Sequence, residues 1–120
     1  MTKILRGLRG ATTATANTSE AILEATEELL AALQTANGFA PEDVESAIFT
    51  TSPDLNADYP ARAARRLGWT EVPLLGAAEV PVPSGLPRCI RVLLHFYTAK
   101  SQGALKHMYL RDAAKLRPDR

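Results

Sequence analysis

The sequence predicts an α/β domain of the α+β type, in which one mixed sheet of about five strands packs against a long amphipathic helix and several short helices. Residues 88–98 alternate apolar and other side chains with the two-residue period of a half-buried strand. Residues 17–36 have the period of an amphipathic helix and carry helix start and stop signals. The 120 residues contain no linker or internal repeat, so we expect one domain over residues 1–120.

Residues 4–13 are expected to form the first strand. Leu8 falls on one face of this strand and Arg9 on the other. Gly7 and Gly10 lie close to Arg9, and a glycine inside a strand often marks the close approach of another backbone or of a ligand. Arg9 is therefore either a solvated arginine at a sheet edge or part of a binding site, and the two interpretations weigh equally.

The long helix is expected to begin after Asn17 and to end before Gly38. Asn17 is a suitable N-cap, and Glu20 follows it at the spacing of a capping box. Asn37 and Gly38 form a stop signal. The apolar stripe of this helix consists of Ile22, Leu29, Leu30 and Leu33. The glutamates on the other side indicate a solvated face, to which we assign no chemistry.

The rest of the chain is expected to alternate short helical segments with strands. Asp58 is expected to cap a short helix, with Pro60 at its start and Gly68 at its end. The expected elements are a helical turn from Pro41, a strand at residues 46–51, the short helix over 61–67, a strand at 71–75, an irregular proline-rich loop at 81–87, the strand at 88–98, a helical turn within 101–106 and an extended segment at 107–113.

The short helix carries three arginines on one broad face, at Arg62, Arg65 and Arg66. No acidic residue lies among them, so they repel one another unless an anion is near. A binding role for this face therefore weighs slightly more than a solvated face that balances a negative patch elsewhere.

The strand at residues 88–98 contains a further candidate, Arg91. This arginine shares its face with Leu93, His95 and Tyr97, inside a strongly apolar strand. Burying a lone guanidinium is costly, so Arg91 should be paired or should bind a ligand. His95 is interpreted as a core or interface histidine rather than as a ligand.

The composition excludes several classes of protein. Ten arginines and four lysines against 13 acidic residues give a net charge of +1, which argues against non-specific nucleic-acid binding. Cys89 is the one cysteine, so neither an intrachain disulfide nor a four-cysteine zinc site can form. Two histidines argue against a histidine-rich metal centre. No apolar run approaches the ~20 residues of a membrane span, and the first residues lack the apolar stretch of a signal peptide. We therefore expect a cytoplasmic protein.

The common catalytic templates are also missing from the sequence. It contains no GxSxG, P-loop, HExxH or Rossmann motif, and Cys89 is best interpreted as a buried strand thiol. What stands out is a set of arginines at strand ends and on a helix, together with Glu79 and Tyr109. Such a set suits a small dianion, because arginine grips carboxylates, a phenol adds a donor and a glutamate accepts from a hydroxyl. It indicates binding more strongly than any reaction.

Several short motifs, in this order and spacing, resemble the small monofunctional chorismate mutases of the trimeric, mixed α/β class. The resemblance covers nearly the whole chain. Its motifs are RGLRGATT at residues 6–13, SPDL at 52–55, YPARAAR at 59–65, Gly68-Trp69, Val72-Pro73, Glu79, CIRV at 89–92, HMYL at 107–110 and LRPD at 116–119.

The resemblance implies an isomerase that converts chorismate to prephenate on the route to phenylalanine and tyrosine. This intramolecular Claisen rearrangement needs no metal or cofactor, only a restrained reactive conformer and positive charge beside the ether oxygen. The family also implies a homotrimer whose sheets form a barrel-like core, with active sites between subunits. No nucleic-acid or membrane partner is expected. One long helix cannot cover both faces of such a sheet, which agrees with burial of the second face by partner subunits.

The resemblance implies roles for individual residues. Arg91 would be the cation at the ether oxygen, and Glu79 would accept from the ring hydroxyl. Arg9 and Tyr109 would hold the side-chain carboxylate. Arg117 would help to close the site over the ring carboxylate.

Other positions would complete the substrate site. The remaining implied site residues are Tyr59, Arg62, Arg65, Leu75, Gly76 and Leu116. Tyr59 replaces a phenylalanine of the family and walls the pocket, while Arg62 and Arg65 line its entrance or the side facing the neighbouring subunit. Gly76 replaces a cysteine, so only backbone could contact the substrate there.

Two other functions fit part of the pattern. A trimeric enamine/imine deaminase would also use an interface arginine for a substrate carboxylate, which explains Arg91 but not Glu79, Tyr109 and Arg117. A non-catalytic module that binds small carboxylates is the other alternative.

Overall fold

Five strands and two α-helices make up the part of the chain that this computed structural model describes, residues 2–116. The strands are β1 (Ile4–Thr13), β2 (Val44–Thr51), β3 (Leu74–Ala78), β4 (Cys89–Thr98) and β5 (Met108–Tyr109). The α-helices are α1 (Ser19–Asn37) and α2 (Ala61–Arg66), and 3-10 turns occur at Pro41–Asp43, Gln102–Ala104 and Arg111–Leu116.

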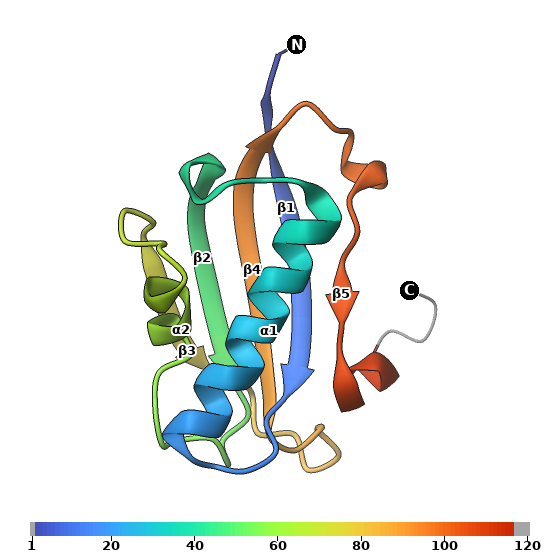
Figure 1. Ribbon diagram of the computed structural model, residues 1–120. Coiled ribbons are helices and arrows are strands. Elements are labelled where there is room, and N and C mark those ends of the chain that lie inside the picture. The colour runs from blue at the N-terminus through green and yellow to red at the C-terminus, as the bar shows by residue number, and fades with distance from the viewer. Residues whose placement is uncertain (1, 117–120) are drawn as a thin grey trace.

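The strands form one sheet in the order β3-β2-β4-β1-β5, and α1 lies across one face of it (Figure 1). The central strand β4 pairs antiparallel with both β1 and β2. The outer strands β3 and β5 pair parallel with their neighbours. The predicted mixed sheet of five strands with one long helix is thus confirmed.

Helix α1 ends as predicted but begins one residue later than expected. Gly38 adopts the left-handed conformation at φ 65°, and its N–H donates to the Gln34 carbonyl. The N-cap, however, is Thr18, whose hydroxyl accepts from the Ala21 N–H at 3.1 Å. The prediction of Asn17 as the cap was wrong, because its side chain bonds a distant loop instead. No helix within residues 2–116 is long and apolar enough to cross a membrane.

The two edge strands, β3 and β5, have other bounds than the sequence predicted. β3 begins three residues later than expected, because its parallel pairing with β2 runs from Ala47↔Leu74 to Thr51↔Ala78 and overrides the poor strand propensity of its small residues. β5 has only two residues, and Arg111, at φ 53°, then turns the chain into a 3-10 segment instead of the extended one expected.

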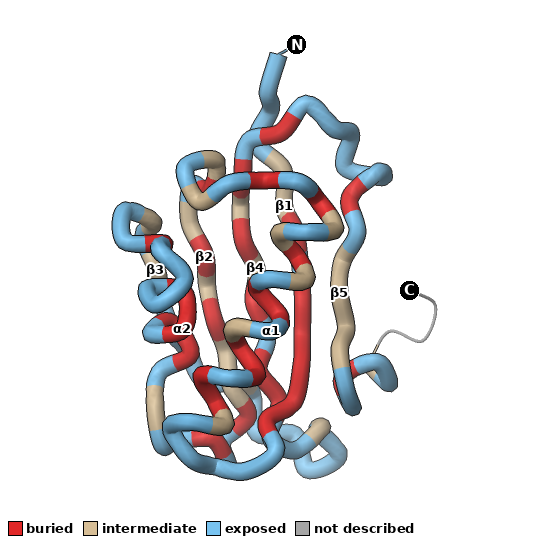
Figure 2. The backbone as a smooth tube through the Cα atoms, viewed as in Figure 1, coloured by how far each residue is buried: buried red, intermediate tan, exposed pale blue. Residues whose placement is uncertain are grey.

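The core lies between α1 and the sheet, and Gly10 controls how closely they approach. A Cβ atom at Gly10 would lie 2.9 Å from Leu33 Cδ1, 3.0 Å from Leu29 Cδ1 and 3.2 Å from the Met108 carbonyl oxygen. The absent side chain therefore lets the leucines of α1 pack directly on β1. The Met108 carbonyl is the close backbone that the glycine pattern suggested for Gly10, whereas nothing lies within 4 Å of a Cβ built at Gly7. In Figure 2 the buried positions follow this contact along α1, β1 and β4.

The opposite face of the sheet carries neither α-helix of the described chain, because α2 packs into the same core as α1 through Ala61 and Ala64. Side chains alternate along β4 as expected: Phe96 is fully buried, and Tyr97 is exposed beside Leu5 of β1. We call this uncovered side of the sheet the open face.

We expect Gly10→Ala to lower the free energy of unfolding by about 1–3 kcal/mol, because the new methyl must displace two leucine tips and meets a backbone oxygen. Urea unfolding of the variant and wild type measures this loss. Gly103→Ala is the control, since no atom lies within 4 Å of a Cβ built at Gly103. An equal loss in both variants would contradict the role given to Gly10.

Candidate functional site

A hollow of about 240 Å³ on the open face brings together four of the predicted site residues. Arg9, Glu79, Arg91 and Tyr109 all line it. The other lining residues are Gly10, Ala11, Ile48, Thr50, Val92 and Leu93.

The sheet register explains why these side chains meet. Arg91 on β4 lies opposite Ala11 of β1 and Thr50 of β2. Arg9 is two residues from Ala11 and therefore shares its face, while Tyr109 pairs with Ala11 from β5. Because Ala11 is small, it leaves space at the centre of the group.

Glu79 reaches the hollow by extending the pairing of β3 with β2. Its N–H donates to the Thr51 carbonyl at 2.9 Å, one residue beyond the end of β3. Thr50 Oγ1 then donates to Glu79 Oε1 at 2.7 Å, and Arg91 Nε lies 3.2 Å from the same oxygen. The arginine of the apolar strand is thus paired, as predicted.

The pair is still accessible to a ligand. The Arg91 side chain is 45% exposed and that of Glu79 is 31% exposed. Thr50 is the contact that the sequence did not indicate, because it enters the site through its register opposite Arg91 and through no local motif.

Arg9 adds a second cation to the hollow. Within residues 2–116 it makes no ion pair, and its backbone N–H donates to His107 Nδ1 at 3.0 Å. With Arg91 and Glu79 the hollow carries two positive charges and one negative. A net positive, partly enclosed space of this size suits a small anion.

The start of β4 is clamped two residues before Arg91. Ser52 Oγ accepts from the Cys89 N–H at 2.8 Å, and Asp54 Oδ2 accepts from the Arg88 N–H at 2.9 Å. The Ser52 hydroxyl, and then the Arg88 N–H, hold the pKa of Asp54 below its ordinary value. These bonds fix the strand that carries Arg91, and they border a neighbouring hollow of about 370 Å³ that Glu79 and Arg91 also line.

The single thiol lies in surroundings that disfavour its thiolate form. Cys89 is buried, and that burial raises the pKa of its thiol despite the opposing effect of Arg91. The prediction of a buried strand thiol is confirmed. Among the described residues, no group of three or more His, Cys, Asp or Glu side chains is arranged to hold a metal ion.

Other predicted site residues lie away from Arg91. Tyr59 and Gly76 line a hollow of about 550 Å³ together with Phe49 and Thr51, whose side chains face the helix-covered side of β2. The sheet therefore separates this hollow from the one on the open face. Leu75 is an exposed residue of β3 at 63%, Leu116 is half-buried in the last 3-10 turn, and Arg117 lies outside the described residues.

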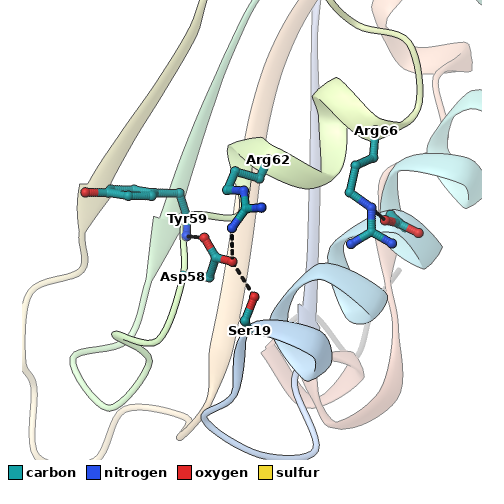
Figure 3. Close-up of polar contacts among 6 residues, drawn as sticks. Ser19, Asp58, Tyr59, Arg62 and Arg66 are labelled. Atoms are coloured by element: carbon teal, nitrogen blue, oxygen red, sulfur yellow. Dashed lines mark hydrogen bonds and ion pairs between the residues drawn. The ribbon is translucent and has the colours of Figure 1, made fainter.

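Two of the three arginines on α2 form ion pairs with carboxylates of the same chain, one in the loop before α2 and one in α1. Arg62 Nη1 lies 2.6 Å from Asp58 Oδ2, and Arg66 Nε lies 2.9 Å from Glu27 Oε1 of α1 (Figure 3). Arg65 makes no ion pair with any residue of the described chain. For Arg62 and Arg66, the nearby anion that the sequence called for is thus a carboxylate of the chain itself.

Asp58 is not the cap that the sequence suggested. The residue before α2 is Pro60, which makes no side-chain capping bond. Asp58 accepts instead from the Tyr59 N–H at 2.7 Å, from Arg62 and from the Ser19 hydroxyl. These bonds, led by that from Ser19, lower the pKa of Asp58 to about 2.

Fold and site together define a small α+β protein with an arginine-lined hollow suited to carboxylates. The family model for chorismate mutase type I matches residues 5–120, and the chain belongs to that family. The family is one of isomerases in aromatic amino-acid biosynthesis.

The chain is similar to curated and solved members of this family. It is 50% identical to Chorismate mutase AroH of Thermus thermophilus over 117 residues, which is 97% of this chain and 96% of that protein. It is 42% identical to Chorismate mutase AroH of Bacillus subtilis, over 97% of this chain and 92% of that protein. A solved chorismate mutase from Clostridium thermocellum superposes with a TM-score of 0.90 at 42% identity, covering 91% of this chain and 97% of that chain.

We expect Asp58→Asn to reduce the acid sensitivity of the fold. A carboxylate whose folded-state pKa is lowered stabilises the fold above its unfolded value of 3.8, and this contribution disappears as the pH falls through about 2. Between about pH 4 and pH 2 the variant should therefore lose less unfolding free energy than wild type. Denaturant unfolding at stepped pH measures the difference.

The control is Glu24→Gln, on the exposed face of α1. If the acid profiles of Asp58→Asn and wild type were the same, the three bonds to Asp58 would not stabilise its charged form.

Proposed function

We propose that this protein catalyses the Claisen rearrangement of chorismate to prephenate, in the cytoplasm. The observation that carries the proposal is the single hollow that contains Arg9, Glu79, Arg91 and Tyr109 in a member of the type I chorismate mutase family. These are the positions to which the sequence resemblance assigns the chemistry.

The reaction needs geometry and charge. Chorismate carries two carboxylates, and Arg9 with Tyr109 would hold the side-chain one, so that the flexible molecule is restrained in a compact conformer. Arg91 would face the ether oxygen, which becomes more negative as its C–O bond breaks. A millionfold acceleration requires ~8 kcal/mol, which positioning and a preorganised cation together can supply.

The Glu79–Arg91 pair supports this role by fixing the guanidinium before the substrate arrives. β4 holds the Arg91 backbone between two strands, and Glu79 holds its Nε. Both Thr50 and Arg91 contact Glu79 Oε1, so the proposal gives Oε2 to the ring hydroxyl of the substrate. A fixed cation needs no reorganisation in the transition state, which is the advantage of a preorganised site.

We further propose that the complete site forms between subunits of a homotrimer. One chain carries two parts of the site on opposite sides of its sheet, since Arg91 faces the open side while Tyr59 and Gly76 line the other hollow. The open face exposes Leu5 and Tyr97, and a partner would bury them. Each cleft would then take Arg91 and its neighbours from one subunit and Tyr59, Arg65 and Gly76 from the next. Leu116 and Arg117 would close it.

Loss of chorismate absorbance, followed with purified protein, is the direct test of the activity. Arg91→Ala and Arg91→Gln should both lower kcat by at least about 10²–10³-fold, because neither replaces the charge at the ether oxygen. Glu79→Ala should cost less, since the group it contacts is remote from the breaking bond.

Lys3→Gln, just before β1, controls for loss of surface charge. Wild-type protein that binds chorismate without turnover would favour the carboxylate-binding module instead. Turnover close to wild type in either Arg91 variant would reject the electrostatic role.

Mixed oligomers test whether the site is shared. Arg91→Ala and Arg65→Ala chains should each be weakened alone, and refolding them together should restore activity. If each site takes Arg91 from one subunit and Arg65 from the next, random mixing leaves about one quarter of the sites intact. The activity of the mixture, compared with each variant refolded alone, measures this. An activity no higher than the mean of the two variants would place both side chains on one subunit.

A further inference from the structure

The loop before α2 is fastened to the start of α1 by bonds that neither element needs for its own formation. Asn17 Oδ1 accepts from the N–H groups of Asn56 and Ala57, both at 3.0 Å, and Asn17 Nδ2 donates to Asn56 Oδ1 at 2.8 Å. Two residues further along, the Ser19 hydroxyl donates to Asp58. Residues 56–58 are thus held against residues 17–19 along their whole length.

Asp58 is the centre of this connection. Its side chain is only 6% exposed, although it lies in a surface loop. One carboxylate oxygen accepts from the Tyr59 N–H, and the other accepts from both Ser19 and Arg62. Three donors from α1, the loop and α2 therefore converge on one carboxylate (Figure 3).

Tyr59 has the opposite surroundings. Tyr59 is 74% exposed, and Figure 3 shows its ring directed away from Asp58 and from α2. The ring is therefore open to solvent in the single chain, while two hydrogen bonds hold its backbone: the Tyr59 N–H donates to Asp58 at 2.7 Å, and the Tyr59 carbonyl accepts from the Arg62 N–H at 3.1 Å. An exposed aromatic on an anchored backbone is suited to contact something outside the chain.

We propose that Asp58 is a positioning residue for the substrate site. It holds the backbone of Tyr59 in place, and it keeps the guanidinium of Arg62 against the loop before α2. This rests on the proposed function, in which Tyr59 and α2 contribute to a neighbouring subunit's cleft. Asp58 touches no substrate in this proposal and acts only through these two residues. Because its bonds lower its pKa to about 2, it keeps its charge throughout the ordinary pH range.

The pairing also affects how α2 presents charge. With Arg62 bound to Asp58 and Arg66 bound to Glu27, Arg65 is the arginine of α2 whose charge no residue of the described chain offsets. Because Asp58 offsets the charge of Arg62, Arg62 contributes to the proposed substrate site through the position of its side chain more than through its charge.

The test compares KM with kcat in Asp58 variants that remain folded, as checked by circular dichroism and gel filtration. Asp58→Ala removes all three bonds, and it should raise KM for chorismate about 5–10-fold while kcat changes less than about twofold, because Arg91 and Glu79 are untouched. Asp58→Asn keeps one acceptor oxygen and should raise KM by a smaller factor, which also covers the case in which Asp58→Ala fails to fold. A purely structural role would lower the active fraction, and therefore kcat, with KM unchanged.

Coupling to Tyr59 gives the second measurement. In a Tyr59→Ala background, Asp58→Ala should raise KM by a clearly smaller factor than in wild type, because one of the two residues that it positions is already gone. Asp43→Asn is the matched control: this carboxylate also accepts a backbone N–H and pairs with a cation, Lys3, but lies before β2. Its KM should equal that of wild type.

The possible outcomes separate the two proposals. Wild-type protein without turnover would overturn the proposed function. With an active wild type, an unchanged KM in Asp58→Asn, or an effect of Asp58→Ala that persists in full without Tyr59, would overturn the positioning role alone.

Discussion

The antiparallel pairing of β4 with β1 and β2 is the constraint on which the candidate site depends. It sets Arg91 opposite Ala11 and Thr50, and it places Arg9 on the same face two residues along. A shift of one residue in this register would turn Arg91 into the core and bring Val92 or Ile90 to the open face. Such a shift would cost the burial of the side chains that this strand turns toward the core, Ile90, Val92, Leu94 and Phe96, so core packing and site geometry are fixed by the same pairing. The clamp from Ser52 and Asp54 at the start of β4 reinforces it.

Local patterns in the sequence were sufficient for the parts of the fold that local physics decides. The alternation along residues 88–98, the leucine stripe of α1 and the stop at Gly38 were all predicted correctly, because each depends on side-chain period or on one backbone conformation. The meeting of Arg9, Glu79, Arg91 and Tyr109 followed from the family resemblance and not from any of these patterns.

The errors share a different cause, which is competition from residues distant in sequence. Asn17 has the chemistry of an N-cap, yet its amide bonds Asn56 and Ala57, and Thr18 caps the helix instead. Asp58 also has the chemistry of an N-cap, and it was predicted to cap the short helix that follows it. Its carboxylate instead accepts from three donors in separate elements. The position of β3 depends on its pairing with β2. Thr50 reaches the site only because the pairing of β2 with β4 sets it opposite Arg91. No single-sequence pattern contains these pairings, because each is decided by which segments the fold brings together.

The arginine excess divides into structural and functional parts once the ion pairs are known. Three arginines each pair with a carboxylate that touches no substrate in these proposals: Arg62 with Asp58, Arg66 with Glu27 and Arg111 with Glu28. Arg91 also has a carboxylate partner, but that pair is accessible and lies in the hollow, where Glu79 can orient the cation without enclosing it. Arg9 and Arg65 lack such partners in the described chain; Arg9 lines the hollow on the open face, and Arg65 lies on α2, which the proposal assigns to the neighbouring subunit's cleft. If these two parts of the proposed site meet between subunits, oligomerisation adds the charge of Arg65 to that of Arg9 and Arg91, which each chain already carries in one hollow. The Asp58 connection would then matter most at this junction, since it anchors Tyr59, which the proposal places in the neighbouring subunit's cleft.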